Sequence, residues 1–255
     1  MEISVLSSGS SGNCFYVSNN NSAILIDAGI SAKRVITSLE LLGKNPEEIQ
    51  GIFITHEHTD HIKGADVLAR KFNIPIFANK KTANSTPLCE NEELIHHLKN
   101  NKEITLGDLQ IGCFSKSHKA ADPVFFSVHG NKKVSVITDA GFACKNIIEH
   151  VSDSDFLCLE SNHDLTMLEQ GPYPYFLKKW ISSDIGHLSN MQASLCVLEH
   201  ASSNLKNIVL SHLSEKNNTP KVALKTFSNL IKERSDLNPK ISVSQQNLPT
   251  SLFRI

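Results

Sequence analysis

The segment THEHTDH, residues 55–61, limits most strongly what this chain can fold into. It places three histidines, a glutamate and an aspartate almost next to one another. Such side chains are costly to desolvate, so the segment is either a solvated loop or a site whose charges meet a bound ion. The apolar run GIFIT (51–55) leads into it, as expected of a strand buried on both faces. DHIKGADVLARKF (60–72) follows with helical periodicity. The sequence therefore predicts a polar loop that joins a strand to a helix.

The spacing inside this segment is typical of metal ligands. His56 and His58 are two residues apart, so on an extended segment both imidazoles face one point. Asp60 and His61 begin the next turn and face a neighbouring point, so one loop can serve two ions. Imidazole and carboxylate together suit zinc, iron or manganese, and a catalytic site keeps one position open. The alternative is a solvated histidine-rich turn.

Charge and composition exclude several classes of protein. Lys and Arg number 25 against 26 Asp and Glu, so the net charge of -1 gives no overall attraction to nucleic acid or anionic lipid. A polyanion must then be met by a local patch or by metal. The start of the chain lacks a signal-peptide pattern, and no apolar stretch approaches the ~18 residues of a membrane span. We expect a cytoplasmic protein without a membrane segment, with its six scattered cysteines reduced.

Strand signals alternate with helical periods along the chain, which predicts an α/β fold. Strands are expected at EISVL, NCFYV, SAILID, GIFIT, LQIGCFS, PVFFSVHG, KVSVITD, FLCLES and NIVLSH. Helices are expected over 30–43, 60–72, 145–151, 161–169, 174–182, 190–201 and 219–234. Residues 79–103 are polar and read as a short helix followed by a loop. No linker or repeat interrupts the pattern, so we expect sheets between helices in a single domain, residues 1–255.

Four isolated polar residues stand where predicted strands end, which is where α/β folds display functional groups. They are Asp27, His118, Asp139 and His212. Each one alone is more commonly a cap or a satisfied polar group. Together they complete two incomplete metal coordination spheres.

The order and spacing of these residues resemble the five motifs of the metallo-β-lactamase fold, an αββα sandwich. The resemblance implies seven ligands for two divalent ions (Zn, Mn or Fe): His56, His58 and His118 for one ion, Asp60, His61 and His212 for the other, and Asp139 bridging both. Asp27 would orient the motif loop from outside the ligand set, as outer carboxylates commonly do. Glu57 is expected to point away from the ions.

Two downstream segments, LESNHDLTML (159–168) and SDIGHLSNMQAS (183–194), carry groups suited to proton transfer. Phosphodiester cleavage leaves an alkoxide, which needs a proton donor or a cation. Glu160, at a strand end, and His187, just before an N-cap at Ser189 or Asn190, are suited to form a carboxylate–imidazolium pair. His163 and Asp164 are candidates for a second pair. Capping residues and surface charges are the alternative interpretation.

These segments also resemble known nucleases. The Glu160 and GHLSN segments are similar to those of tRNase Z nucleases, and LSSGSSGNCFYV, LESNHD, GPYP and GHLSN resemble the YycJ/WalJ (VicX) group of metallo-β-lactamase-fold proteins. Membership implies a metal-dependent phosphodiesterase, a DNA exonuclease acting 5′ to 3′. A hydroxide bridging the two ions would be the nucleophile. The predicted catalytic residues are Asp60, Asp139, Glu160, His187 and His163.

Further contacts to the substrate are predicted from a loop and from basic pairs. The backbone amides of Ser8, Gly9, Ser10, Ser11, Gly12 and Asn13 are expected to cradle a phosphate, and a tight turn between strands is the equal alternative. The pairs Lys132 and Lys133, Lys178 and Lys179, and Lys216 with Lys221 are candidates for tracking a nucleic-acid backbone, although such pairs usually belong to a solvated face.

Other functions stay open at this stage. One is a hydrolase of small phosphodiesters or thioesters, and another is a non-catalytic metal-binding signalling partner. Only 72 residues separate Asp139 from His212, too few for the inserted cap domain of β-CASP nucleases. No segment resembles the long basic arm of tRNase Z enzymes. Specificity for tRNA is therefore not expected. The resemblance to the YycJ/WalJ group implies DNA as the partner, and whether the chain forms a homodimer is left open.

Overall fold

The computed structural model describes residues 1–255. It divides into two compact units, neither of which is continuous in sequence. The first unit contains Met1–Ser115, Ala120–Lys132 and Gln245–Ile255, and the second contains Lys116–Lys119 and Lys133–Ser244. The expectation of a single domain stays a prediction.

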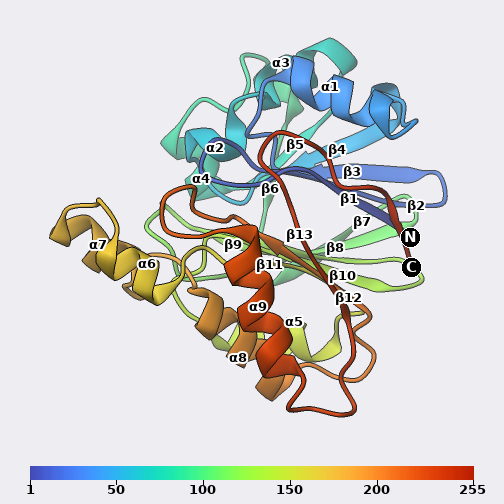
Figure 1. Cartoon of the computed structure of the whole chain (residues 1–255). Coiled ribbons are helices and arrows are strands. Elements are labelled where there is room, and N and C mark those ends of the chain that lie inside the picture. Colours follow the sequence, from blue (N-terminus) through green and yellow to red (C-terminus); the bar gives the residue numbers. More distant parts are fainter. The chain divides into compact units, whose positions relative to one another are not determined.

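The first unit is built on a seven-stranded sheet with the order β14-β1-β2-β3-β4-β5-β6 (Figure 1). β1, β2 and β3 pair antiparallel, whereas β3 to β6 pair parallel. The strands are β1 (Glu2–Ser7), β2 (Cys14–Asn19), β3 (Ser22–Ile26), β4 (Ile49–Phe53), β5 (Ile76–Asn79), β6 (Ile95–Leu98) and β14 (Phe253–Arg254). The parallel pairing explains why β3 is an unbroken apolar run, since parallel strands are covered on both faces. The residues that follow β3 and β4, Asp27 and the THEHTDH segment, leave the sheet at the same edge.

The helices of the first unit are α1 (Ala32–Leu41), α2 (Thr59–Ile62), α3 (Ala65–Phe72) and α4 (Lys80–Ser85), with short 3-10 turns at Pro46–Glu48 and Glu92–Leu94. Helix α1 is capped by the Ser31 hydroxyl, buries Val35 and Leu39, and contacts α3. The single helix predicted over 60–72 is wrong, because the chain breaks between α2 and α3. The Gly64 amide donates to the Ala28 carbonyl at 2.7 Å, and a Cβ at Gly64 would lie 2.3 Å from the Ile30 carbonyl oxygen. The chain must therefore turn at this glycine.

Three more strands of the first unit pair antiparallel, β7 (Lys102–Leu106), β8 (Leu109–Ser115) and β9 (Val124–His129). The stretch 79–103 begins with the expected helix, α4, but the expected loop contains β6 and the start of β7. β6 lies at the end of its sheet and exposes His96 and His97. A polar edge strand gives no alternating apolar signal, which is why the sequence pattern missed it.

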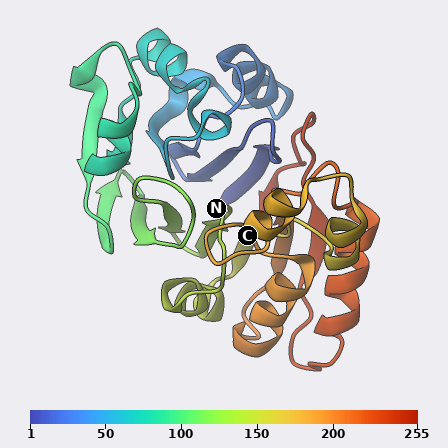
Figure 2. The ribbon, with the colours of Figure 1, turned by 90° about the vertical axis from the view of Figure 1, so that its left-hand side faces the viewer.

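The second unit has four parallel strands, β10 (Lys133–Ile137), β11 (Phe156–Glu160), β12 (Asn207–Ser211) and β13 (Lys240–Val243). Its helices are α5 (Lys145–Asp153), α6 (Leu165–Gln170), α7 (Tyr175–Ile181), α8 (Asn190–His200) and α9 (Pro220–Ile231). Helix α8 packs between α5 and α9 (Figure 2). Because the strands are parallel, their carboxyl ends meet at one edge. Asp139, Glu160 and His212 stand at or just beyond these ends.

Several predicted boundaries shift in the second unit. The helix expected over 161–169 begins only at Leu165, because the Asp164 side chain accepts a hydrogen bond from the Met167 amide and caps it. The helix expected to reach 234 ends at Ile231. Ser189 is the N-cap of α8, as predicted, and forms a capping box with Gln192. None of the six cysteines forms a disulfide, and none of the helices is both long and apolar enough to cross a bilayer.

Candidate metal centre and proton-transfer residues

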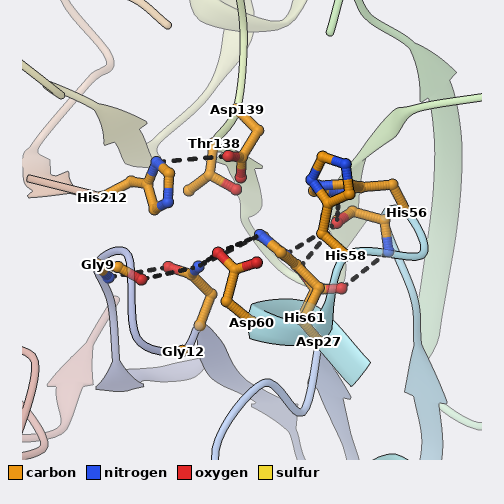
Figure 3. Close-up of polar contacts among 12 residues, drawn as sticks. Gly9, Gly12, Asp27, His56, His58, Asp60, His61, Thr138, Asp139 and His212 are labelled. Atoms are coloured by element: carbon orange, nitrogen blue, oxygen red, sulfur yellow. Dashed lines mark hydrogen bonds and ion pairs between the residues drawn. The ribbon is translucent and has the colours of Figure 1, made fainter. Parts of the chain in front are cut away.

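Asp27 organises the histidine loop of the first unit (Figure 3). Its carboxylate is fully buried and accepts hydrogen bonds from the Thr55 amide (2.8 Å) and the Thr55 hydroxyl (2.9 Å). The third donor is Nδ1 of His61, 2.7 Å from Oδ2. Since Nδ1 carries the proton in this arrangement, Nε2 of His61 is left as the ligand atom. This geometry supports the orienting role predicted for Asp27.

The other predicted ligands of the loop converge in two sets. His56 Nε2 lies 3.0 Å from His58 Nδ1, and His61 Nε2 lies 3.4 Å from Asp60 Oδ2. His56 Nδ1 is 2.9 Å from the Thr55 hydroxyl, so Thr55 links Asp27 to a second imidazole. Converging imidazole and carboxylate atoms form the donor set that divalent transition metals take. The first unit therefore brings His56 and His58 together, and Asp60 and His61 together, as the spacing predicted.

Glu57, the remaining acidic residue of the segment, serves the backbone. Its Oε1 accepts a hydrogen bond from the Ala121 amide at 2.8 Å. This contact accounts for an acidic residue between two histidines without assigning it to a metal.

The backbone amides of the Ser/Gly loop already have hydrogen-bond acceptors. The amides of Ser8, Gly9, Ser11, Gly12 and Asn13 all donate to acceptors within the first unit. The predicted phosphate-binding role stays a prediction, and the exposed Ser10 and Ser11 are the residues best placed to serve it.

Asn13 connects this loop to the histidine segment. Its side-chain oxygen accepts from the Gly9 amide (3.1 Å) and the Ser8 hydroxyl (2.9 Å). Its amide nitrogen lies 3.5 Å from Asp60 Oδ2 and 3.3 Å from His61 Nε2. The loop thus helps to position two predicted ligands, a role that sequence reasoning missed.

Gln246 holds the same loop from the far end of the sequence. Its Oε1 accepts from the Ser11 amide at 3.2 Å, and its Nε2 donates to the Ser7 hydroxyl and the Gly12 carbonyl, each at 3.2 Å. No local pattern marks Gln246, because its partners lie about 235 residues earlier.

Glu160 is the corresponding carboxylate of the second unit, and it is fully buried. Its Oε1 accepts from Nδ1 of His187 (2.9 Å) and of His212 (2.8 Å). Its Oε2 accepts from the amides of Ala140 (2.8 Å) and Leu188 (3.0 Å). Burial alone would raise the pKa of Glu160, but the charge of His187 and the hydrogen bonds from both imidazoles hold it well below its usual range. The predicted Glu160–His187 pair is present, and Glu160 also orients His212.

The predicted ligands of the second unit are oriented in the same way. His118 Nδ1 donates to the Gly186 carbonyl at 3.0 Å, and His212 Nδ1 donates to Glu160, so each Nε2 is the ligand atom. Asp139 Oδ1 lies 3.9 Å from His118 Nε2 and 3.5 Å from His212 Nδ1. Burial lowers the pKa of His118 to about 4, which keeps its imidazole in the neutral, metal-binding form.

Potential ligand atoms of Asp139, Glu160, His187 and His212 all lie within 4.8 Å of one another. Glu160 already accepts four hydrogen bonds, so within this cluster Asp139 and His212 are the better metal ligands. The donor chemistry fits a divalent ion, in agreement with the metal predicted from the sequence.

Backbone strain also marks the candidate centre. Asp27, Asp139 and His212 have positive φ angles of 56°, 52° and 56°, and each follows a strand, β3, β10 and β12 respectively. Non-glycine residues rarely adopt this conformation, and such strain collects at functional sites. It turns each side chain sharply away from the strand direction, a feature that residue type alone does not predict.

Two sequence predictions in the second unit are wrong. His163 does not pair with Asp164, because Asp164 caps α6 and both ring nitrogens of the fully buried His163 lack a hydrogen-bond partner. Burial lowers the pKa of His163 to about 4. Lys133 is not available to track a nucleic acid, because it is buried and its ammonium group pairs with Asp153.

Comparison with known proteins places the chain in a class. Residues 8–116 match the family model described as the metallo-beta-lactamase superfamily. Two solved structures share the fold over almost the whole chain. One is the metallo-beta-lactamase fold protein YhfI from Bacillus subtilis, with a TM-score of 0.74, 13% identity and 98% of each chain covered. The other is human tRNase Z, short form, with a TM-score of 0.68, 15% identity, and 98% of this chain and 99% of that chain covered. The predicted fold class, an α/β sandwich of this type, is confirmed.

Two curated relatives narrow the class. Exodeoxyribonuclease YycJ of Bacillus anthracis is 37% identical over 243 residues, which is 92% of this chain and 90% of the relative. Exodeoxyribonuclease WalJ of Streptococcus pneumoniae is 38% identical over 232 residues, 89% of this chain and 86% of the relative. The chain belongs to the YycJ/WalJ family of the metallo-β-lactamase superfamily.

Proposed function

We propose that this protein is a dinuclear metal-dependent phosphodiesterase, a DNA exonuclease that digests from the 5′ end. The substrate is inferred from the relatives, both of which are named exodeoxyribonucleases. The proposed ligands are the seven residues predicted from the sequence, His56, His58, Asp60, His61, His118, Asp139 and His212. When bound, the two ions would activate water and stabilise the charge that develops on the phosphate oxygens.

One observation supports this proposal above all others. In His61, His118 and His212 the Nδ1 atom is held by Asp27, by the Gly186 carbonyl and by Glu160, respectively. An imidazole fixed in this way presents its Nε2 as a ligand at no further orientational cost. A solvated histidine-rich turn would not need a buried acceptor behind each ring. The metal-binding interpretation is therefore favoured over the solvated turn.

Proton transfer to the leaving alkoxide is assigned to His187. Its Nδ1 donates to the buried Glu160 carboxylate at 2.9 Å, which fixes the orientation of the ring. An imidazolium meets the need of an alkoxide for a proton, and such general-acid catalysis contributes roughly 10²–10⁴-fold to rate. Asp60 and Asp139 serve as charged ligands, and the catalytic role predicted for the fully buried His163 stays a prediction. We further propose a cytoplasmic location, and a homodimer is left as an open possibility.

The test is digestion of 5′-labelled single- and double-stranded DNA by protein purified without chelator, with Mn²⁺ or Zn²⁺ added. We expect about two metal ions per chain and release of 5′ nucleotides. Asp139→Ala should abolish cleavage, whereas Asp236→Ala, a control at an exposed aspartate paired with Arg234, should not. Two ions per chain without cleavage of DNA or RNA would overturn the nuclease proposal and point to small phosphodiesters or thioesters.

The role of His187 has its own test. His187→Ala should lower turnover by roughly 10²–10⁴-fold while the metal content stays unchanged. Normal turnover in this variant would remove the general-acid role without affecting the metal-site proposal.

A further inference from the structure

Helices α6 and α7 form a projection of the second unit. The chain leaves β11 at Glu160, passes His163 into α6, turns through GPYP and returns along α7 to His187. Both helices stand away from strands β10 to β13 in Figure 1. Backbone hydrogen bonds close the base of the projection, from the Asn162 amide to the Leu188 carbonyl (2.9 Å) and from the Asn190 amide to the His163 carbonyl (2.8 Å). The projection is thus rooted on the segments that carry the proton-transfer residues.

The projection exposes large apolar side chains. Tyr175 and Phe176 are each 74% exposed and Leu165 is 53% exposed. Helix α7 is anchored by other residues, because Ile181 is buried and the Trp180 ring meets the His187 ring edge to face at 5.6 Å. Neither exposed aromatic ring is needed to hold the helix in place. A cluster of such side chains on the surface marks an interaction site.

Basic groups lie beside these rings. Tyr175 and Leu165 line a surface hollow of about 470 Å³ together with Lys178, Lys179 and Glu169. Lys179 Nζ lies 5.6 Å from the Tyr175 ring centroid, and Lys178 Nζ donates to the Glu169 carbonyl at 2.6 Å. Two lysines against one glutamate give the hollow a local positive charge, whereas the whole chain carries -1. The hollow therefore suits an anionic partner that also has flat apolar faces.

We propose that the α6–α7 projection binds a single-stranded segment of the nucleic-acid substrate. The rings of Tyr175 and Phe176 stack on bases, and Lys179 contacts a phosphate. Stacking tolerates any base, as an exonuclease that is indifferent to sequence requires. This inference rests on the proposed nuclease function. A lipid surface also suits aromatic and lysine side chains. However, the projection begins and ends on the segments that carry Glu160, His163 and His187, which favours the substrate over a lipid surface.

The binding test uses a labelled 12-nucleotide oligothymidylate, with chelator present so that nothing is cleaved. Fluorescence anisotropy should show a dissociation constant at least tenfold higher for Tyr175→Ala/Phe176→Ala than for the unchanged protein, since each base stack contributes about fivefold or more. Tyr175→Phe/Phe176→Tyr keeps both rings and should restore binding. Leu41→Ala, a control at an exposed residue of the first unit, should bind normally. Lys179→Gln should lower the slope of log affinity against log salt by about 0.7.

A kinetic test separates this inference from the proposed function. With Mn²⁺ present, Tyr175→Ala/Phe176→Ala should raise the KM for single-stranded DNA. The reference substrate is p-nitrophenyl thymidine 5′-phosphate, a diester too small to reach the projection. The increase in KM for DNA should be at least tenfold larger than any change in KM for this small diester. Unaltered oligonucleotide binding in this variant would overturn the projection's role while DNA cleavage by the unchanged protein continues. Absence of DNA cleavage by the unchanged protein would instead refute the nuclease function. Binding to vesicles of anionic phospholipid and not to the oligonucleotide would replace the substrate by a lipid surface.

Discussion

The two units each contain one buried carboxylate that orients imidazoles, but they use it differently. Asp27 holds a single imidazole directly, His61, and reaches His56 through the Thr55 hydroxyl. All of its side-chain partners come from residues 55–61. The partners of Asp27 therefore all belong to one short segment, and the hydroxyl that connects Asp27 to His56 is neutral.

Glu160 in the second unit holds two imidazoles on one oxygen, and their histidines lie 27 and 52 residues further along the chain. Its second oxygen is occupied by two backbone amides. Of the two imidazoles, His212 is a proposed metal ligand, whereas His187 is the proposed proton donor. We therefore expect the Asp27 arrangement to position ligands only, and the Glu160 arrangement to serve proton transfer as well.

Glu160→Gln should separate the two arrangements most strongly. The amide keeps the shape of the side chain but removes the negative charge that accepts the hydrogen bond from the proposed proton donor His187, so we expect turnover to fall by roughly 10²–10⁴-fold. Steady-state kinetics at saturating metal would measure it, with Glu199→Gln as a control at a more exposed glutamate. A loss in Glu160→Gln that is fully recovered by extra metal would mean that Glu160, like Asp27, only positions ligands.

His163→Phe tests how a buried imidazole without a hydrogen-bond partner affects the free energy of unfolding. The arrangement around Asp27 contains no such imidazole. The pKa of His163 is lowered to about 4 from an ordinary value of 6.5, so the unfolded chain binds this proton first as the pH falls. The stability present above pH 6.5 should therefore be lost between pH 6.5 and 4, by about 3 kcal/mol for such a shift. Urea unfolding of metal-free protein across this window should show a smaller loss in His163→Phe. The exposed His97→Gln should follow the unchanged protein, and equal slopes in all three would contradict the assignment.

Asp27→Asn should weaken metal binding with a smaller effect on chemistry. Asparagine tolerates the positive φ at this position, so the backbone is preserved. Loss of the outer carboxylate should cost roughly 10–100-fold in metal affinity, measurable by titration against a competing chelator. Turnover at saturating metal should stay near that of the unchanged protein. A loss of turnover as large as that in Glu160→Gln would show that the two carboxylates have the same role.

Thr55→Val should have the smallest effect. It removes the hydroxyl that joins Asp27 to His56 but keeps the backbone amide on Asp27. We expect the free energy of unfolding to fall by about 1 kcal/mol, the usual net contribution of one hydrogen bond. Thr55→Ser keeps the hydroxyl and should be close to unchanged in the same denaturation experiment. Destabilisation of Thr55→Ser as large as that of Thr55→Val would contradict this assignment, because serine keeps the hydroxyl.

The arrangement around Asp27 was the easier one to predict from the sequence. His56, His58, Asp60 and His61 lie in one short segment after a strand, so their spacing alone indicated two sets of ligands. The strands and helices around them followed from apolar periods. The break at Gly64 did not, because it depends on the close approach of the Ile30 carbonyl from another part of the chain.

The second arrangement depends on contacts between distant residues. The sequence indicated Glu160 and His187 as a pair, but not that Glu160 also holds His212, nor that Gly186 holds His118. It paired His163 with Asp164, because adjacent residues invite such an interpretation and helix capping was overlooked. Sequence spacing predicts which residues lie close together within one loop. It does not predict which residues parallel strands bring together from distant parts of the chain.

The hydrogen bonds from Gln246 to the Ser/Gly loop can form only late in translation. The loop and the histidine segment leave the ribosome early, but the side chain that fastens Ser7, Ser11 and Gly12 is added about 235 residues after Ser11. At 5–20 residues per second this interval is roughly ten to fifty seconds. Throughout that time the loop next to Asp60 and His61 lacks its hydrogen bonds to Gln246. A growing chain therefore carries this loop without its C-terminal contacts until translation is nearly finished.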